Sequence, residues 1–134
     1  MTPLEATESL ERLDAVADAD EAGVYALRVD VPSGVDAVQR QWLNTIGVAL
    51  PDEYAAQLAS AETCLYVGAT SRPIRERIAE HARSDVRRAS FIRAYGVADV
   101  AGVWPGASTG VAERDRARAL SGDETAVWCD GELF

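Results

Sequence analysis

The stretch "YVGATSRPIRERIAEH", residues 66–81, decides the fold because its sequence predicts a strand that passes directly into a helix. The segment 63–68, "TCLYVG", is a short apolar run that ends at a glycine, which is typical of a buried strand. A helix is predicted over 72–83. It carries Arg77 and, one turn later, His81, the single histidine of the chain. This clustering asks for an explanation.

Helical geometry places both polar side chains beside the apolar stripe of that helix. At about 100° per residue, Arg77 and His81 fall at the border of the stripe that faces the sheet, so we expect them neither buried nor fully outward. There they would overhang a sheet surface from which Tyr25 or Tyr66 could project. A pocket with a cation, an imidazole and phenols suits an anion, above all a phosphodiester. The alternative is that these four are solvated edge residues and ordinary sheet aromatics.

Outward from this stretch, helices alternate with short strands. Strands are predicted over 23–31, 63–68, 97–104 and 125–129. Helices are predicted over 3–17, 35–47, a short segment opened by Pro51, 72–83, 85–95 and 111–120. Ser71 and Ser84 are candidate helix caps, and Pro73 fits a first helical turn. This order predicts a mixture of helices and strands on a small sheet whose first two strands pair antiparallel.

The charge of the chain is strongly acidic but uneven. The net charge is −9, and all 13 basic residues are arginine, a composition that resembles that of salt-loving archaea. Dense carboxylates keep such a surface hydrated. Residues 1–21 carry seven acids and one arginine, whereas residues 72–93 carry seven arginines and three acids. The acidic total argues against a simple basic nucleic-acid module, but the second segment predicts one local basic patch.

Several classes of protein are disfavoured by composition. No apolar run approaches the roughly 20 residues of a membrane span, and the acidic start lacks the pattern of a signal peptide. We therefore expect a cytoplasmic protein without membrane contact. Cys64 and Cys129 are the only cysteines, and with one histidine they make a structural zinc site improbable. Buried thiols are the simplest interpretation.

Five positions, taken together, match a known pattern. "GVY" at 23–25 lies on one predicted strand and "YVG" at 66–68 on the next, followed by Arg77, three further residues and His81. A later predicted helix, "GVAERDRARAL", supplies Glu113. In this combination the chain resembles the GIY-YIG nuclease family, with valine in place of isoleucine in both name motifs.

The resemblance implies an α+β fold with a small, mainly antiparallel sheet of three to four strands flanked by helices. It covers roughly residues 22–121. The domain organisation expected from it is an acidic helical extension over 1–21 and one domain over 22–134. A helical insertion at about 33–62 separates the two tyrosine motifs, with Trp42 and Tyr54 packing it against the domain.

The resemblance also implies an activity, namely metal-dependent endonucleolytic hydrolysis of DNA. Glu113 would hold one Mg²⁺ or Mn²⁺, and Arg77 would bind the scissile phosphate. Tyr25 would position or deprotonate the attacking water, while Tyr66 and His81 would complete the network. His81 is a rival for the role of base because it titrates near neutrality. The nucleic-acid backbone would be bound by the arginines of the basic patch, of which the main candidates are Arg72, Arg75, Arg87 and Arg88.

Departures from the family pattern leave alternatives open. Family members often carry an asparagine near the site and a lysine near the first tyrosine. Here Asn44, the only asparagine, lies in the insertion, and lysine is absent. One alternative is a non-catalytic nucleic-acid-binding or regulatory module on the same fold. Another is a protein-interaction domain that uses the acidic helix 3–17 and the insertion. A homodimer or an unidentified protein partner is compatible with either function.

Overall fold

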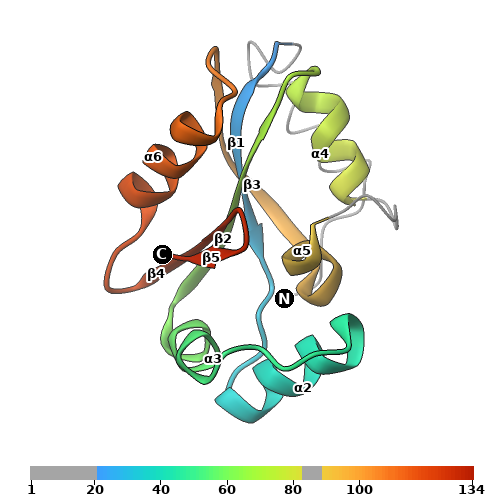
Figure 1. The fold of residues 1–134 in the computed structure, drawn as a ribbon, viewed down its shortest axis with the longest axis vertical. Coiled ribbons are helices and arrows are strands. Elements are labelled where there is room, and N and C mark those ends of the chain that lie inside the picture. Colours follow the sequence, from blue (N-terminus) through green and yellow to red (C-terminus); the bar gives the residue numbers. More distant parts are fainter. Residues whose placement is uncertain (1–20, 83–88) are drawn as a thin grey trace.

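The computed structural model describes residues 21–82 and 89–134, and it shows an α+β fold built on one mixed sheet (Figure 1). The strands are β1 (Gly23–Val29), β2 (Thr63–Thr70), β3 (Val97–Pro105), β4 (Thr125–Cys129) and β5 (Glu132–Leu133). The helices are α2 (Val35–Ile46), α3 (Asp52–Ser60), α4 (Ile74–Ala82), α5 (Ser90–Tyr95) and α6 (Gly110–Leu120). The expected N-terminal helix 3–17 lies outside the described residues.

The sheet has the strand order β3-β1-β2-β4-β5. β1 pairs antiparallel with both β2 and β3, and β4 pairs antiparallel with β5. The predicted antiparallel pairing of the first two strands is therefore confirmed. The expectation of three to four strands is too small, because the turn at Asp130-Gly131 folds the last residues back as β5. The sheet is also mixed, since β2 and β4 run parallel.

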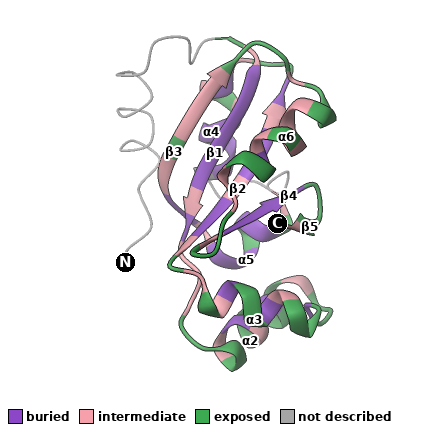
Figure 2. Ribbon diagram, turned by 90° about the vertical axis from the view of Figure 1, so that its left-hand side faces the viewer, coloured by how far each residue is buried: buried purple, intermediate pink, exposed green. Residues whose placement is uncertain are grey.

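The alternation of side chains along β1 divides the core between the two faces of the sheet. Tyr25, Leu27 and Val29 belong to the larger cluster, which also contains buried side chains of α2, α3, α4 and α5. Val24 and Ala26 belong to a smaller cluster, which α6 covers through Ala117. Because successive residues of a strand point to opposite faces, α6 lies on the face opposite the other helices. Figure 2 shows the central strands buried between these layers.

The two helices between β1 and β2 pack at one end of the molecule (Figure 1). Trp42 of α2 and Tyr54 of α3 both contact Trp128 of β4, with ring centroids 5.3 and 6.0 Å apart. Trp128 in turn stacks on Phe91 of α5 at 5.1 Å. The predicted packing of Trp42 and Tyr54 against the domain is therefore observed, and its anchor is an indole from the C-terminal strand.

The predicted start of the helix after β2 differs from the structure, and so does its predicted cap at Ser71. The helix after β2 begins at Ile74 rather than 72, and the Pro73 carbonyl accepts hydrogen bonds from the Glu76 and Arg77 amides. Proline at this position forces extended backbone before it. The Thr70 hydroxyl, not a cap at Ser71, accepts from the Arg72 amide at 3.1 Å. Helix α5 begins at Ser90, whereas the predicted start at 85 and the expected cap, Ser84, lie outside the described residues.

None of the helices within 21–82 and 89–134 combines the length and apolar character needed to cross a membrane.

Candidate functional site

The centre of the candidate site is Tyr25, whose ring lies over Gly68 of the neighbouring strand. Tyr25 and Gly68 are direct partners in the β1–β2 register. A β-carbon at Gly68 would lie 2.5 Å from the Tyr25 hydroxyl oxygen and 3.0 Å from the Tyr66 ring. The glycine of the second motif therefore makes room for the phenol of the first. Tyr66, two residues before Gly68, projects from the same face of β2.

His81 completes a group of three rings with the two tyrosines. The Tyr25 hydroxyl oxygen lies 2.7 Å from Nε2 of His81. The imidazole centroid lies 5.7 Å from that of Tyr25 and 5.3 Å from that of Tyr66, and the two phenol centroids are 6.3 Å apart. Residues separated by 56 positions in the sequence thus share one hydrogen bond.

The expectation that His81 is neither buried nor fully outward is wrong. Tyr25 is 1% exposed and His81 is fully buried. The reason is that His81 follows the buried Ile74 and Ile78 at helical spacing, so it continues the apolar stripe of α4 toward the sheet instead of bordering it. Arg77 and Tyr66 remain partly exposed, as the sequence predicts for Arg77.

Burial opposes ionisation of both phenols. Loss of hydration raises the pKa of Tyr25 well above its usual value, and the neighbouring Tyr66 adds to the effect. Burial and the Glu113 carboxylate raise the pKa of Tyr66 to about 12. Arg77 lowers both pKa values, whereas the hydrogen bond between the two hydroxyls raises the pKa of Tyr25 and lowers that of Tyr66. Neither phenol is therefore a base on its own near neutral pH.

Arg77 lies within electrostatic reach of both phenols, but its guanidinium also binds a carboxylate. Nη1 of Arg77 lies 2.7 Å from Oε2 of Glu80. The same carboxylate receives Arg72, at 2.7 Å from Nη1 to Oε1 and 2.9 Å from Nη2 to Oε2. Hydrogen bonds from Arg72 and then Arg77 lower the pKa of Glu80 to about 2. Glu80 therefore holds two cations side by side at the start and middle of α4.

The position of Glu80 follows from helical spacing. Three residues after Arg77, Glu80 is a close neighbour on the same helix face, and it is 9% exposed. Arg72, which precedes the helix, reaches past Glu76 to bind it.

Glu113 approaches the site from α6, on the opposite face of the sheet. Thr109 caps this helix by accepting a hydrogen bond from the Ala112 amide, and Glu113 follows in the first turn. β4 pairs with β2 only from Thr63 to Tyr66, so β4 does not cover the end of β2. There the carboxylate accepts hydrogen bonds from the Cys129 thiol, at 3.3 Å, and from the Ala69 amide. In this way Glu113 reaches around the sheet edge toward Tyr66.

The electrostatics of Glu113 combine burial with neighbouring polar groups. Burial raises the pKa of its carboxyl group, the Cys129 hydrogen bond lowers it, and the nearby Asp130 carboxylate raises it. Burial, followed by the hydrogen bond to Glu113, raises the pKa of the Cys129 thiol to about 12. The thiol is therefore a donor that holds the carboxylate in place.

The side chains around Glu113 suit only a metal ion that needs few protein ligands. Within residues 21–82 and 89–134, no three His, Cys, Asp or Glu side chains form a metal-binding group. Glu113 offers one partly exposed carboxylate, which lies near enough to Tyr66 to raise the pKa of that phenol. Mg²⁺ and Mn²⁺ accept such sites when water and phosphate oxygens supply the remaining ligands. Glu113 thus fits a hard divalent cation that binds together with a phosphodiester.

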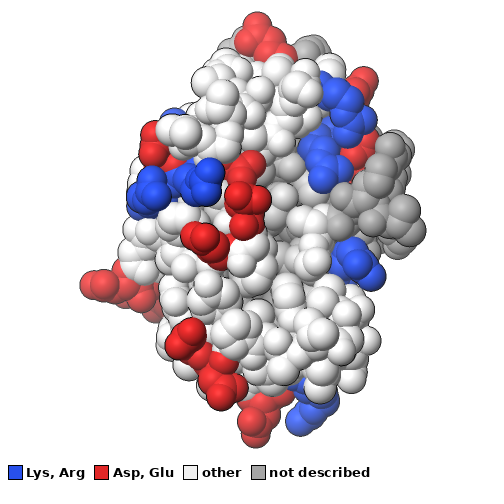
Figure 3. Space-filling view, viewed as in Figure 1, with Lys and Arg blue, Asp and Glu red and all other residues white. Residues whose placement is uncertain are grey.

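Only part of the predicted basic patch lies within the residues that the structure describes. Arg72 pairs with Glu80, Arg75 is partly buried, and Arg87 and Arg88 lie outside the described residues. Figure 3 shows basic side chains over α4 and a second group over α6, with acidic side chains between them near the β4–β5 turn. The second group comprises the arginines of α6, which are Arg114, Arg116 and Arg118.

Sequence reasoning missed Glu80, Cys129, Asp130 and the α6 arginines. For the arginines a signal existed, because "ERDRARAL" places three of them at alternate positions directly after Glu113. Glu80 carried a signal too, since it lies three residues after Arg77. Cys129 and Asp130 carried none, because only the parallel pairing of β4 with β2 brings the C-terminal strand to the site.

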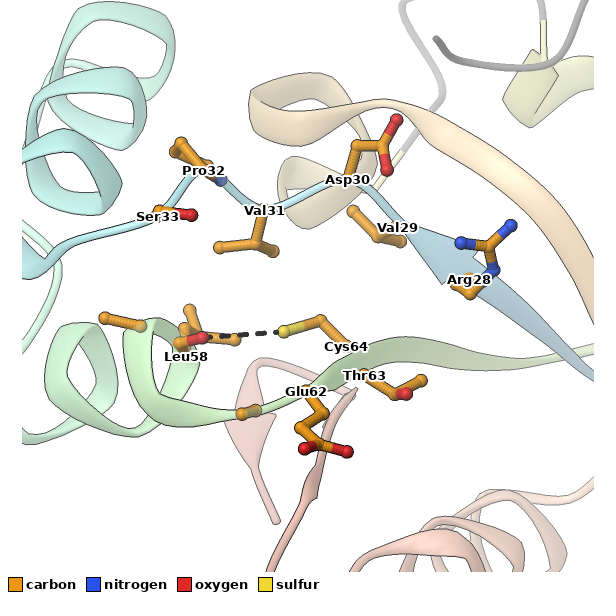
Figure 4. Close-up of a pocket in the computed structure, with 12 residues that line it drawn as sticks. Arg28, Val29, Asp30, Val31, Pro32, Ser33, Leu58, Glu62, Thr63 and Cys64 are labelled. Atoms are coloured by element: carbon orange, nitrogen blue, oxygen red, sulfur yellow. Dashed lines mark hydrogen bonds between the residues drawn. The ribbon is translucent and has the colours of Figure 1, made fainter. Parts of the chain in front are cut away.

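A separate pocket of about 160 Å³ lies where β1 and β2 diverge toward the insertion (Figure 4). Val31 and Cys64 face each other across it, and the Cys64 thiol donates to the Leu58 carbonyl at 3.7 Å. Arg28 at its rim pairs with Asp99 at 3.7 Å. None of the five predicted catalytic residues lines this pocket.

No protein-family model matches the chain, and neither a curated protein nor a solved structure matches it.

Proposed function

We propose that the protein is a metal-dependent endonuclease of the GIY-YIG type that hydrolyses phosphodiester bonds in DNA. The observation that carries this proposal is the convergence of Tyr25, Tyr66, His81 and Arg77 at the end of β2 that Glu113 reaches from the opposite face. These residues come from two strands and two helices, and ordinary packing does not require a guanidinium near two phenols and a carboxylate near one of them.

The substrate phosphate would meet the partly exposed members of this group. Arg77 would bind the scissile phosphate and the additional charge of its transition state, while Glu80 keeps the guanidinium directed to the site. Glu113 would hold Mg²⁺ or Mn²⁺, which supplies charge stabilisation for the leaving oxygen. The two arginine groups over α4 and α6 would contact the nucleic-acid backbone on either side.

Burial of the imidazole suggests how water is activated. Tyr66, Tyr25 and His81 form a connected series from the protein surface to Nε2 of the imidazole. As the attacking water loses a proton to the Tyr66 oxygen, Tyr66 passes its own proton to Tyr25, and Tyr25 passes its proton to His81. In this relay neither phenol becomes a free phenolate, which agrees with their raised pKa values.

A second candidate function is a non-catalytic nucleic-acid-binding module on the same fold. It is favoured by the burial of Tyr25 and His81 and by the occupation of Arg72 and Arg77 by Glu80. Such a module would bind DNA or RNA through its arginines without a metal and without cutting.

Nicking of supercoiled plasmid DNA distinguishes the two functions. We expect nicking with Mg²⁺ or Mn²⁺ and none with EDTA. Arg77→Ala and Glu113→Gln should each reduce the rate by at least 100-fold, which is the scale reported for removal of one transition-state contact. Arg40→Ala and Glu53→Gln, at exposed positions of the insertion, are matched controls that should cut at the wild-type rate.

Two results would contradict the nuclease proposal. One is full activity of the Arg77→Ala/Glu113→Gln double variant with its fold intact by circular dichroism. The other is metal-independent binding of DNA by the wild-type protein with no cleavage of duplex, branched or single-stranded substrates.

A further inference from the structure

A second pocket opens directly beside Tyr66, and the proposed chemistry uses none of its other walls. Its volume is about 270 Å³. This Tyr66 pocket is lined by residues from three separate segments of the chain, which are Tyr66, Ala89, Ser90, Trp128, Asp130 and Gly131. Pockets for drug-sized ligands begin at roughly 300 Å³, so this one suits a single flat ring system.

The walls of the Tyr66 pocket are aromatic and held in place. Trp128 is 7% exposed and is fixed by its stacking on Phe91, with the ring planes inclined by only 7°. Tyr66 is fixed by its contacts with Tyr25 and His81. Rigid aromatic rings beside a phosphate-binding residue are the usual platform for nucleobases, because every base has a face that can stack.

The exposed polar side chains in the lining of the pocket are those of Asp130 and Ser90. Asp130 and Gly131 form the two-residue β4–β5 turn with φ values of 51° and 81°, the combination found in type I′ hairpins. This turn places the exposed Asp130 in the lining of the pocket, to which the exposed Ser90 also belongs. A carboxylate only accepts hydrogen bonds. Its Oδ2 lies 3.9 Å from Nη1 of Arg114, and the acceptor sites that this ion pair does not use favour a ligand with N–H donors.

We propose that the Tyr66 pocket receives one unstacked nucleobase of the substrate, from the nucleotide next to the phosphate at Arg77. A base that presents adjacent N–H donors to Asp130, as guanine does with N1 and its 2-amino group, is preferred. The position of the phosphate rests on the proposed function, but the pocket, its aromatic walls and its carboxylate do not.

Binding of single-stranded DNA without metal tests this inference. A set of fluorescein-labelled strands, each with one abasic site at a different position, is titrated in EDTA and followed by fluorescence anisotropy. We expect one abasic position to weaken binding about tenfold, the scale for loss of one base–aromatic stack. Ser90→Phe, which fills the pocket, should weaken the intact strand by a similar factor and show no further loss at that position.

Two further variants sharpen the assignment. Asp130→Asn tolerates the same backbone conformation and should remove the preference for guanine at the sensitive position while retaining binding of the strand. Ser60→Phe, an exposed serine of the insertion, is the matched control and should bind every strand as the wild type does.

The outcomes separate this inference from the proposed function. Cleavage of DNA together with equal affinity for all abasic strands, or wild-type binding by Ser90→Phe, would overturn the nucleobase pocket alone. A position-specific abasic effect without cleavage under any metal condition would support the pocket and overturn the nuclease. Absence of binding to every strand at low salt would overturn the pocket, and plasmid nicking with metal would then decide the nuclease separately.

Discussion

The Tyr25 hydroxyl and Nε2 of His81 lie 2.7 Å apart in the interior, where 1% of Tyr25 and none of His81 is exposed. This single contact links the first motif strand to the helix that follows the second. A buried polar pair is stable only while each partner satisfies the other, because neither can turn to water. The pair is therefore both a structural joint between β1 and α4 and the inner end of the proposed proton relay.

Removal of the Tyr25 hydroxyl should destabilise the protein. Tyr25→Phe preserves the ring but leaves Nε2 of His81 without this partner, and we expect a loss of about 1–3 kcal/mol in the free energy of unfolding. Urea unfolding measures it. Tyr66→Phe, at a partly exposed position, is the control and should cost less. Equal losses in the two variants would contradict the importance of the buried pair.

A methyl group at Gly68 of β2 should disturb the contact between Tyr25 and His81 by displacing the Tyr25 ring. Its β-carbon would lie 2.5 Å from the Tyr25 oxygen and 2.6 Å from Cζ, so Gly68→Ala should destabilise by about 1–3 kcal/mol through overpacking. Because Tyr25→Phe removes one of the two close atoms, the double variant should lose less than the sum of the single losses. Gly122→Ala, where a β-carbon meets nothing within 4 Å, should be nearly neutral. Strict additivity in the double variant would show that the two residues do not collide.

Acid should weaken the protein partly through Glu80. Its pKa is lowered to about 2 in the fold, against about 4.3 in an unfolded chain. A lowered folded pKa contributes stability that is present above the unfolded pKa and disappears as the pH falls toward the folded value. Thermal unfolding of the wild type between pH 5 and pH 2 should therefore show a steeper fall in melting temperature than that of Glu80→Gln. The control is Glu76→Gln, an exposed site on the same helix, which should retain the wild-type slope.

Alkaline pH should also destabilise the protein, because the contribution of Tyr66 to stability is lost as the pH rises. Burial raises the folded pKa of Tyr66 to about 12, compared with about 10 in an unfolded chain. The stability from this difference is complete below pH 10 and disappears as the pH rises toward 12. We expect the absorbance of phenolate to rise together with unfolding in that range, and Tyr66→Phe to be less sensitive to alkali than the wild type. Ionisation of Tyr66 near pH 10 without unfolding would show that the ring is more hydrated than in the structure.

The local elements could be predicted because their causes lie in neighbouring residues. Apolar runs between glycines define β1 and β2, and helical spacing defines α2 and α6. The spacing of Arg77 and His81, one helical turn apart, also indicated that both would approach the sheet. The motif pattern further pointed to Tyr25, Tyr66 and Glu113, residues that the fold brings to one end of β2.

The tertiary structure decided which side chains are exposed to solvent and which side chains contact each other. Helical spacing placed His81 near the apolar stripe, but only the closeness of α4 to β1 determines that the imidazole is buried against Tyr25 instead of bordering solvent. Likewise, the parallel pairing of β4 with β2 brings Cys129 to Glu113 and Asp130 to the pocket beside Tyr66. The sequence by itself determined which side chains share a strand or a helix face, because periodicity is local. The fold alone decided which of them meet and which of them water reaches, because those contacts join residues far apart in the sequence, such as Tyr25 and His81, which are 56 positions apart.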